Sequence, residues 1–295
     1  IFLKKDGSLW AMGQNENGQL GDGTNTDRSS PVNVVDVNVT FITAGYYNSF
    51  FLKNNGSLWV MGKNGGGQFG NGTFSSQASP VEILSSGIVW VTSGEDHSLI
   101  IKDDGSLWAM GKNGWGQLGN GTTNWTTTPV QIVQSGVVKA TCGAHHSIFL
   151  KEDGSLWAMG RNDHGQLGDD TTTNRFTPVK VRENVINISS GQDFNLIVRS
   201  DGTLETFGLN TTASLGDGAP FLYNSPVEIE SGGVTAVFPG KIHSLFLKED
   251  GSLWGMGSNN AGQFGNGNHT SLADPGKLFD ENISQAAAGE GHSLF

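Results

Sequence analysis

Asp6-Gly7-Ser8-Leu9-Trp10-Ala11-Met12-Gly13 is the stretch that decides the fold, because it recurs with small changes along the whole chain of 295 residues. Successive copies are 49, 49, 49, 48 and 49 residues apart. The glycine after the aspartate position falls at Gly7, Gly56, Gly105, Gly154, Gly202 and Gly251. Self-similarity at a fixed period of this length indicates a repeat architecture.

Two further phrases keep the same period. The phrase Gly18-Gln19-Leu20-Gly21 recurs with its glutamine at Gln68, Gln117, Gln166 and Gln263, and with Ser214 in the fifth copy. A His-Ser pair follows a glycine by three residues, with the histidines at His97, His146, His243 and His292. Asn48-Ser49 and Phe194-Asn195 take its place in the other two copies. The chain therefore contains six copies of one unit of about 49 residues.

Each unit carries the pattern of four short strands. In one copy we expect them at residues 147–150, 155–160, 178–181 and 185–189. Asp153-Gly154 marks a tight hairpin between the first two. Pro178 is expected to begin the third, because proline cannot donate a hydrogen bond inside a ladder. No helical period extends over ten residues, so the pattern predicts an all-β fold, a β-propeller of four-stranded antiparallel blades.

These phrases together resemble the regulator of chromosome condensation repeat in its bacterial variety. The phrases concerned are Asp-Gly-Ser-Leu-Trp, Gly-Gln-Leu-Gly-Asp-Gly-Thr, Pro-Val and Gly-x-x-His-Ser, and the resemblance covers essentially the whole chain. It implies a rigid disc that presents loops. Members of that family act as guanine-nucleotide exchange factors, as modules of ubiquitin ligases and, in bacteria, as a secreted inhibitor of β-lactamase.

We interpret residues 1–295 as a single propeller domain. The chain ends with His292-Ser293-Leu294-Phe295 and begins with residues that would continue the same strand. We favour a six-bladed ring closed by both termini. Because propellers of this family usually have seven blades, the alternative is a seven-bladed ring, or a longer array, of which this chain is a portion.

The net charge of −11 limits the kinds of partner. A protein that binds nucleic acid through phosphates needs clustered Lys and Arg, and the 17 basic residues form no run, so we predict no nucleic-acid partner. No apolar run approaches the roughly 20 residues that span a bilayer, which predicts no membrane insertion. The single cysteine, Cys142, allows no internal disulfide and is interpreted as a small core residue.

Residues that recur at the repeat period are interpreted as structural. This applies to the tryptophans and methionines of the first phrase, Trp10, Trp59, Trp108, Trp157, Trp254, Met12, Met61, Met110, Met159 and Met256. Equivalent histidines on different blades would form a ring, whereas zinc needs ligands about 2.1 Å from one point, so each imidazole is expected to hydrogen-bond a neighbouring strand or loop. The Gly-Asp-Gly and Gly-Asn-Gly turns carry one carboxylate or amide per copy, whereas calcium takes several oxygens. We therefore predict no metal and no cofactor.

Departures from the repeat are the candidates for function. Trp115 and Trp125 flank one loop, and Tyr46 and Tyr47 stand where other copies have smaller or charged residues. The fifth copy replaces Trp-Ala-Met by Glu205-Thr206-Phe207 and carries Phe221 and Tyr223 in a loop that is otherwise rich in threonine. Aromatic side chains in loops bury a large area at low entropic cost. The binding candidates are Trp115, Trp125, Tyr46, Tyr47, Phe221 and Tyr223, and the alternative is that they only pack over the blade edges.

Asn-x-Ser/Thr sequences would matter in a glycosylating compartment. The candidate acceptors are Asn38, Asn124, Asn187, Asn210, Asn268 and Asn282. Together with the low content of charged residues they favour an extracellular or cell-surface location, and a cytoplasmic location is the alternative.

The hypothesis we favour is a non-catalytic propeller whose loops bind another protein. Neither paired carboxylates nor a nucleophile stand outside the repeat pattern, so we predict that the chain is not an enzyme. Two alternatives are a structural subunit of a cell surface or appendage and a carbohydrate-binding module that uses the loop aromatics, which would make a glycan the partner. A guanine-nucleotide exchange factor is disfavoured, because the sequence has no wedge-like insertion and is acidic.

Overall fold

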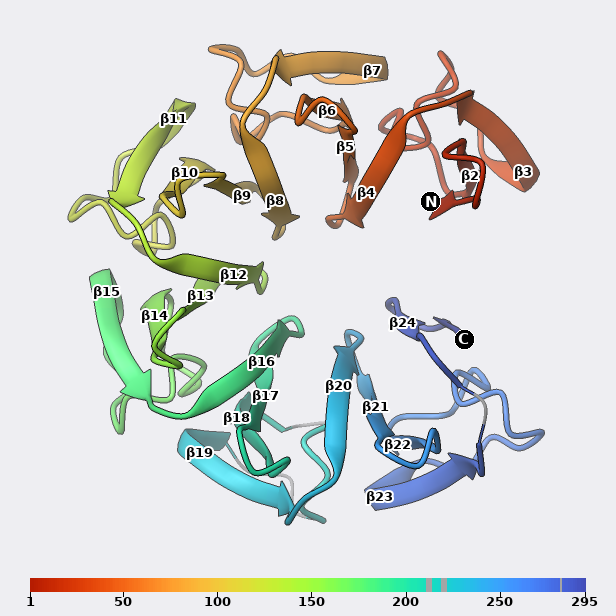
Figure 1. Ribbon diagram of the computed structural model, residues 1–295, viewed down its shortest axis with the longest axis vertical. Helices are drawn as coiled ribbons and strands as arrows, with labels where there is room; N and C mark the ends of the chain where they lie inside the picture. The colour runs from red at the N-terminus through yellow and green to blue at the C-terminus, as the bar shows by residue number, and fades with distance from the viewer. Residues whose placement is uncertain (211–213, 219–221, 282) are drawn as a thin grey trace. The chain divides into compact units, whose positions relative to one another are not determined.

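The computed structural model describes residues 1–210, 214–218, 222–281 and 283–295, and in them all regular structure is β-strand. None of these residues belongs to a helix that could cross a membrane. The chain divides into two compact units, Ile1–His145 (unit 1) and His146–Phe295 (unit 2). Figure 1 labels the strands of both units.

Unit 1 consists of antiparallel sheets in which consecutive strands are neighbours. The first sheet has the order β1-β2-β3, the second β4-β5-β6-β7 and the third β8-β9-β10-β11, while β12 lies against β8 and β9. The strands are β1 (Phe2–Leu3), β2 (Leu9–Gly13), β3 (Arg28–Val35), β4 (Val39–Ala44), β5 (Asn48–Lys53), β6 (Leu58–Gly62), β7 (Gln77–Leu84), β8 (Ile88–Ser93), β9 (His97–Lys102), β10 (Leu107–Gly111), β11 (Thr126–Val133) and β12 (Val137–Cys142).

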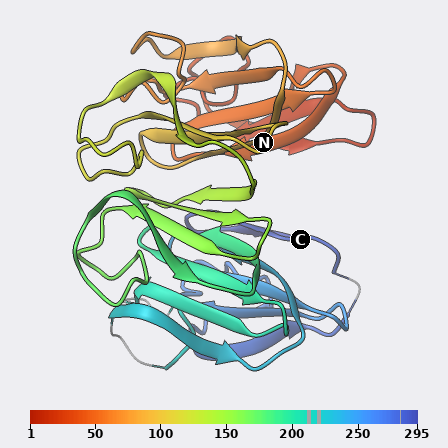
Figure 2. The same cartoon turned by 60° about the vertical axis from the view of Figure 1, so that its left-hand side comes forward.

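Unit 2 repeats this plan. The strands β13, β14 and β15 pair in that order, followed by the sheets β16-β17-β18-β19, β20-β21-β22-β23 and β24-β25. They are β13 (His146–Lys151), β14 (Leu156–Gly160), β15 (Arg175–Arg182), β16 (Val185–Ser190), β17 (Phe194–Arg199), β18 (Leu204–Leu209), β19 (Leu222–Glu230), β20 (Val234–Pro239), β21 (His243–Lys248), β22 (Leu253–Gly257), β23 (Leu272–Phe279), β24 (Ala287–Ala288) and β25 (Ser293–Leu294). The sheets of unit 2 (green to blue in Figure 2) lie side by side.

The fold class is the one that the sequence predicts, an all-β, six-bladed propeller of mostly four-stranded antiparallel sheets. One boundary in the prediction was wrong. The strand at 185–190 does not complete the sheet of the preceding strands but pairs with β17 as the first strand of the next sheet. The last strand of each sequence unit is thus the first strand of the following blade.

The start of the third strand was also wrong. The structure begins β15 at Arg175 rather than at Pro178. Ala158 pairs with Val179 and Gly160 with Arg175, so that Met159 alone faces residues 176–178. Pro178 lies within this bulge, on a strand at the edge of its sheet. An edge bulge tolerates proline because no ladder hydrogen bond is required from its nitrogen.

The core lies between neighbouring sheets. In unit 1, Phe50 and Val60 of one sheet pack with Val91, Ile100 and Met110 of the next, all completely buried. The predicted packing role fits the repeat methionines, because Met61, Met110, Met159 and Met256 are fully buried, whereas Met12 is exposed. Cys142 is also buried.

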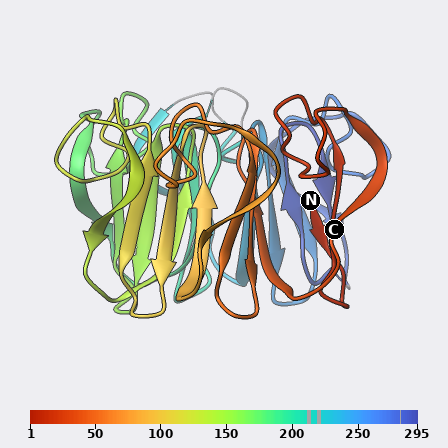
Figure 3. The ribbon, with the colours of Figure 1, turned by 90° about the horizontal axis from the view of Figure 1, so that it is seen from above.

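Long and short connections leave opposite ends of the strands, as the strands of unit 1 show (red to yellow in Figure 3). The short turns carry the Asp-Gly pairs, for example between β9 and β10. The long loops follow the Trp-x-Met-Gly strands and include residues 63–76 and 112–125. They share their end of the sheets with the Gly-x-x-His turns, so this end carries Tyr46, Tyr47, Trp115 and Trp125.

Candidate interaction surface

A buried asparagine organises each long loop. In the third copy, Asn113 accepts a hydrogen bond from the backbone nitrogen of Leu118 at 3.0 Å through Oδ1. Its Nδ2 donates to Oδ1 of Asn120 at 3.0 Å and to the carbonyl oxygen of Thr122 at 2.8 Å. The side chain thereby closes the loop on itself. Sequence reasoning missed this position, which recurs as Asn15, Asn64, Asn113, Asn162, Asn210 and Asn259.

The Gly-Asp-Gly turns are built by local hydrogen bonds. Oδ1 of Asp22 accepts hydrogen bonds from the backbone nitrogen and the hydroxyl of Thr24, at 3.0 and 2.7 Å. Oδ2 of Asp22 pairs with Nε of Arg28 at 2.6 Å. Burial raises the pKa of Asp22, but the bonds from Thr24 and Arg28 outweigh burial and lower it overall. In the residues described, no group of three His, Cys, Asp or Glu side chains is arranged to hold a metal ion.

Two of the repeat histidines, His146 and His243, hydrogen-bond to the next copy, as predicted. His146 Nε2 lies 3.0 Å from Oδ1 of Asn195, and His243 Nε2 lies 2.8 Å from Oγ of Ser293. Asn195 in turn donates to the carbonyl oxygen of Gln166 at 2.7 Å. Burial, with a smaller contribution from His292, lowers the pKa of His243 to about 4. The imidazole of His243 is therefore neutral at pH 7 and links its own copy of the repeat to the next.

The repeat tryptophans are half-buried and structural. Trp157 donates from Nε1 to Oγ of Ser155 at 2.9 Å and stacks on Phe149, with ring centroids 6.3 Å apart. Lys151 places its Nζ 5.0 Å from the same ring, within the range of a cation–π interaction. The equivalent tryptophans Trp10, Trp59, Trp108 and Trp254 make the same contacts with their own serine and lysine.

A Lys–Asp–Lys bridge joins two long loops of unit 1. Lys112 Nζ lies 2.5 Å from Oδ2 of Asp96, and Lys63 Nζ lies 3.3 Å from Oδ1. The Asp96 side chain is only 4 % exposed, while both lysines are about a third exposed. Burial raises the pKa of Asp96, but the two ammonium groups lower it by more. The pKa therefore lies below its ordinary value, and the carboxylate stays charged. One buried anion thus fixes two cations at the surface.

Aromatic rings continue this bridge at both ends. Trp125 lies with its ring centroid 5.2 Å from Nζ of Lys112, and Tyr47 lies 5.0 Å from Nζ of Lys63. Tyr46 extends the row beyond Tyr47, with ring centroids 6.4 Å apart. Trp125 is 50 % exposed and Tyr46 is 38 % exposed. We call the row Tyr46, Tyr47, Lys63, Asp96, Lys112 and Trp125 the tyrosine–tryptophan surface.

The structure thus brings three of the predicted binding residues, Tyr46, Tyr47 and Trp125, into one row. Trp115 lies in the same loop as Lys112, between β10 and β11, and is 41 % exposed. Beside the row, His145 Nε2 lies 3.5 Å from Oε2 of Glu95. Sequence reasoning did not single out the charged residues that connect the aromatics.

The two binding candidates of the fifth copy, Phe221 and Tyr223, are not part of the tyrosine–tryptophan surface. Tyr223 donates its hydroxyl to Asp217, and its ring packs against the core of unit 2, so it stabilises its own loop. Phe221 lies outside the described residues.

The candidate glycosylation sites differ in how exposed their asparagine side chains are. Asn38, Asn124 and Asn268 are exposed. Asn187 lies in β16 and donates to the carbonyl oxygen of Thr235 at 3.3 Å. Asn210 is completely buried and its Oδ1 accepts the backbone nitrogen of Leu215, so the prediction of a glycan acceptor there was wrong. Asn282 lies outside the described residues.

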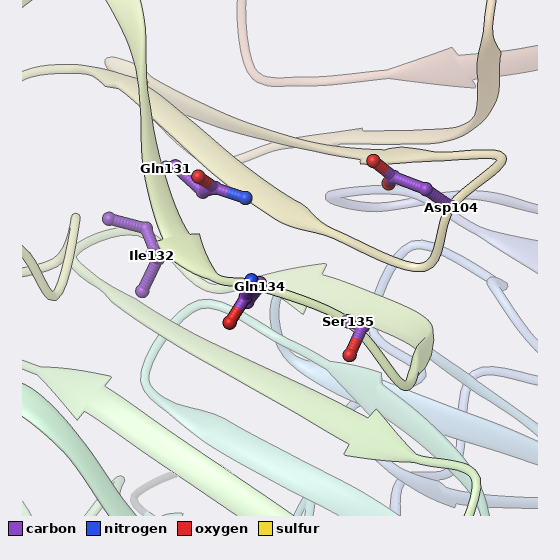
Figure 4. Close-up of a pocket in the computed structure, with 5 residues that line it drawn as sticks. All are labelled: Asp104, Gln131, Ile132, Gln134 and Ser135. Carbon is purple, nitrogen blue, oxygen red and sulfur yellow. The ribbon is translucent and has the colours of Figure 1, made fainter.

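An open hollow of about 640 Å³ lies on unit 1 near the end of β11. It is lined by Asp104, Gln131, Ile132, Gln134 and Ser135. Figure 4 shows Asp104 on one hairpin and the other four on β11 and the turn after it. The polar groups are spread along the hollow and do not converge on one point, which is unlike the arrangement that fixes a small substrate.

Comparison with known proteins agrees with this architecture. A family model described as an RCC1-like domain matches residues 1–295. Human WBSCR16 superposes with a TM-score of 0.84 at 22 % identity, over 96 % of this chain and 79 % of that chain. Prp20p from Saccharomyces cerevisiae, studied for its binding to Gsp1p and histones, superposes with a TM-score of 0.85 at 20 % identity, over 99 % and 78 %. Yeast RCC1 (Prp20) in its complex with Kap60 superposes with a TM-score of 0.84 at 19 % identity, over 99 % of this chain and 77 % of that chain. No curated protein sequence matches the chain significantly.

Proposed function

The chain belongs to the RCC1-like domain family, and from this premise we propose that it is a non-catalytic propeller that binds another protein through the tyrosine–tryptophan surface. The RCC1-like propeller is a fold used for protein binding. Prp20 has been solved with Kap60, and the proposal extends only the kind of partner, a protein, to this chain.

The observation that carries the proposal is the row itself. Trp125 and Tyr46 are large, amphipathic and half exposed, and the lysines beside them are held in place by buried Asp96. Aromatic side chains dominate the binding energy of protein interfaces, because they fill pockets of the partner at little entropic cost. Because the bridge fixes the lysines, little further ordering is needed when a partner binds.

The proposal also rests on how the polar groups are used. The carboxylates of the long loops and the imidazoles between blades are engaged in hydrogen bonds that shape the propeller. Catalysis requires a nucleophile or a pair of titratable groups directed at one point of a cleft. The polar groups of the hollow near β11 are spread out instead, which supports a role in binding over one in chemistry.

The experiment is a quantitative pull-down from the source organism with three baits. They are the native chain, the double variant Tyr46→Ala/Trp125→Ala and the control Phe176→Ala, which removes an aromatic residue of similar exposure on β15. We expect one protein at a stoichiometric level with the native and control baits and its loss with the double variant. Recovery of envelope polymer or glycan alone would favour the structural or carbohydrate-binding alternatives and contradict the proposal.

A further inference from the structure

One junction between blades breaks the repeat at three positions together. Between the two four-stranded sheets of unit 1, Leu84 and Trp108 pack against the same buried cluster, and Lys102 places its Nζ 4.0 Å from the ring centroid of Trp108. Two copies later, at the junction of the fourth and fifth copies, the equivalent positions hold Arg182, Arg199 and Glu205. An apolar contact and a cation–π pair are thus replaced by an ionic cluster.

The cluster is centred on one buried carboxylate. Arg182 donates from Nε to Oε2 of Glu205 at 2.9 Å and from Nη2 to Oε1. Arg199 approaches Oε1 through Nη1 at 3.4 Å. The Glu205 side chain is 4 % exposed. Two guanidinium groups therefore share a single carboxylate. One of the two positive charges is left without a counter-charge within the cluster.

Several donors of these arginines are unused. Among the described residues, Nη1 of Arg182 has no acceptor within hydrogen-bond distance. The Nε of Arg199 is buried and likewise has no acceptor in the part of the chain that the structure describes. Leaving a buried donor of a charged group unpaired is costly, so such groups in folded proteins call for an explanation.

These arginines border an open hollow of about 430 Å³. It is lined by Lys180, Val181, Arg182, Glu183, Asn184 and Arg199, which we call the arginine hollow. Lys180 Nζ pairs with Oε1 of Glu183 at 2.6 Å, but the Glu183 side chain is 70 % exposed and can turn into solvent. Asp153 acts on Lys180 only as a more distant charge. Three cations, Lys180, Arg182 and Arg199, thus border a space whose lining holds one carboxylate, the exposed Glu183. Buried Glu205 is shared by the two arginines, and Asp170 acts on Arg182 as a further negative charge.

The hollow near β11 provides an internal comparison. It lies at the equivalent end of β11, and Gln131, Ile132 and Gln134 take the places of Lys180, Val181 and Glu183. Of the residues that the structure describes, none of those lining it is basic (Figure 4). A hollow therefore occurs at two equivalent places in the repeat, once with and once without basic residues in its lining.

We propose that the arginine hollow is a binding site for a phosphate group, either as free phosphate or as a phosphate monoester on another molecule. Arginine binds phosphate oxygens through planar sets of N–H donors. Glu205 takes up Nε and Nη2 of Arg182 and Nη1 of Arg199, so Nη1 of Arg182 and the remaining donors of Arg199 are the ones left for a phosphate group. Lys180 adds a third, partly exposed cation to the lining of the hollow. Because the chain as a whole is acidic, an anion is attracted here by these local charges rather than by the overall field.

The test is a titration with inorganic phosphate at constant ionic strength, followed by NMR on the full chain. The signals are the backbone amides of Val181 and Asn184 and the side-chain Nε of Arg199. We expect saturable shifts with phosphate that chloride does not produce. Equal shifts with phosphate and with chloride would overturn the proposal.

Two variants separate binding from folding. The triple variant Arg182→Leu/Arg199→Lys/Glu205→Trp restores the pattern of Leu84, Lys102 and Trp108, so it removes the site without leaving a buried charge unpaired. We expect phosphate to bind it at least tenfold more weakly than the native chain. Lys180→Gln, which copies Gln131 at an exposed position, is expected to weaken binding two- to fivefold. Unchanged affinity in both variants would overturn the proposal.

Two further measurements complete the test. One is a control variant, and the other asks whether the bound phosphate is the free anion or part of a modified protein. Gln131→Ala, in the uncharged hollow, is expected to leave phosphate binding unchanged, and a loss equal to that of the triple variant would contradict the assignment. A phosphoserine peptide is compared with inorganic phosphate and with the unphosphorylated peptide. Tighter binding of the phosphopeptide identifies a modified protein as the source, and equal affinity identifies the free anion. Preference for the unphosphorylated peptide would overturn the proposal.

Discussion

Lys112 Nζ lies 2.5 Å from the buried carboxylate of Asp96, which holds Lys63 from its other side. A buried carboxylate with two cations has a lower pKa than in the unfolded chain, where the pKa is about 4. Its contribution to stability is therefore complete above about pH 4 and is lost as the pH falls toward the lower, folded-state pKa. The ion bridge that fixes the tyrosine–tryptophan surface thus depends on pH in a direction that can be measured.

We predict that Asp96→Asn is less stable than the native chain at neutral pH and that the difference narrows on acidification below about pH 4. The measurement is the melting temperature of both proteins between pH 3 and pH 7. The comparison isolates Asp96 because the other acidic groups are the same in both proteins. A difference that does not change with pH would mean that the Lys63 and Lys112 bridges contribute nothing.

His243 is predicted to be a second source of pH dependence. Its folded-state pKa of about 4 lies below the usual value of 6.5, so its contribution is present above pH 6.5 and is lost as the pH falls from 6.5 to 4. The shift corresponds to about 3 kcal/mol at most. The free energy of unfolding, measured by chemical unfolding at pH 7.5 and at pH 5, should fall less between these pH values in His243→Gln than in the native chain. His269→Gln, at an exposed histidine, is the control and should behave like the native chain.

The buried asparagine of each long loop is predicted to be essential for stability. Asn113→Ala leaves the buried backbone nitrogen of Leu118 without its acceptor and removes the donors to Asn120 and Thr122. We expect a loss of about 2–3 kcal/mol in the free energy of unfolding. Asn124→Ala, at an exposed position in the same loop, should change it by less than about 0.5 kcal/mol. Equal effects in urea titrations would contradict the role given to Asn113.

Tryptophans inside and outside the repeat pattern should differ in the same assay. Trp157→Ala removes the stacking on Phe149 and the hydrogen bond to Ser155, and we expect it to cost about 2–3 kcal/mol. Trp125→Ala removes a half-exposed ring and its cation–π contact with Lys112, for which we expect less than about 1 kcal/mol. A larger loss at Trp125 would mean that this ring supports the fold rather than a binding surface.

The sequence predicts the fold well because the period carries most of the information. Hairpins at Asp-Gly pairs, buried methionines and hydrogen-bonded histidines all follow from residues that recur about every 49 positions. The assignment of the strand at 185–190 failed because a period is the same wherever counting starts, so it cannot show which sheet receives that strand. Pro178 was misplaced because an edge bulge, unlike a ladder, accepts proline.

The candidate surface is predictable only in part. Tyr46, Tyr47 and Trp125 are visible as departures from the repeat, but the lysines that join them stand at a position that varies from copy to copy and so give no signal. Lys63 and Lys112 are one full period apart, and only the fold brings both to Asp96. The arginine cluster gave a signal, the replacement of tryptophan by Glu205, but its partner Arg182 comes from the neighbouring blade, which a single repeat does not reveal.

The most direct test of protein binding through the tyrosine–tryptophan surface is the dissociation constant of the recovered partner, measured by calorimetry with purified proteins. We expect Tyr46→Ala/Trp125→Ala to weaken binding at least a hundredfold and Phe176→Ala to leave it unchanged. Unchanged binding in the double variant, or an equal loss in Phe176→Ala, would contradict the account.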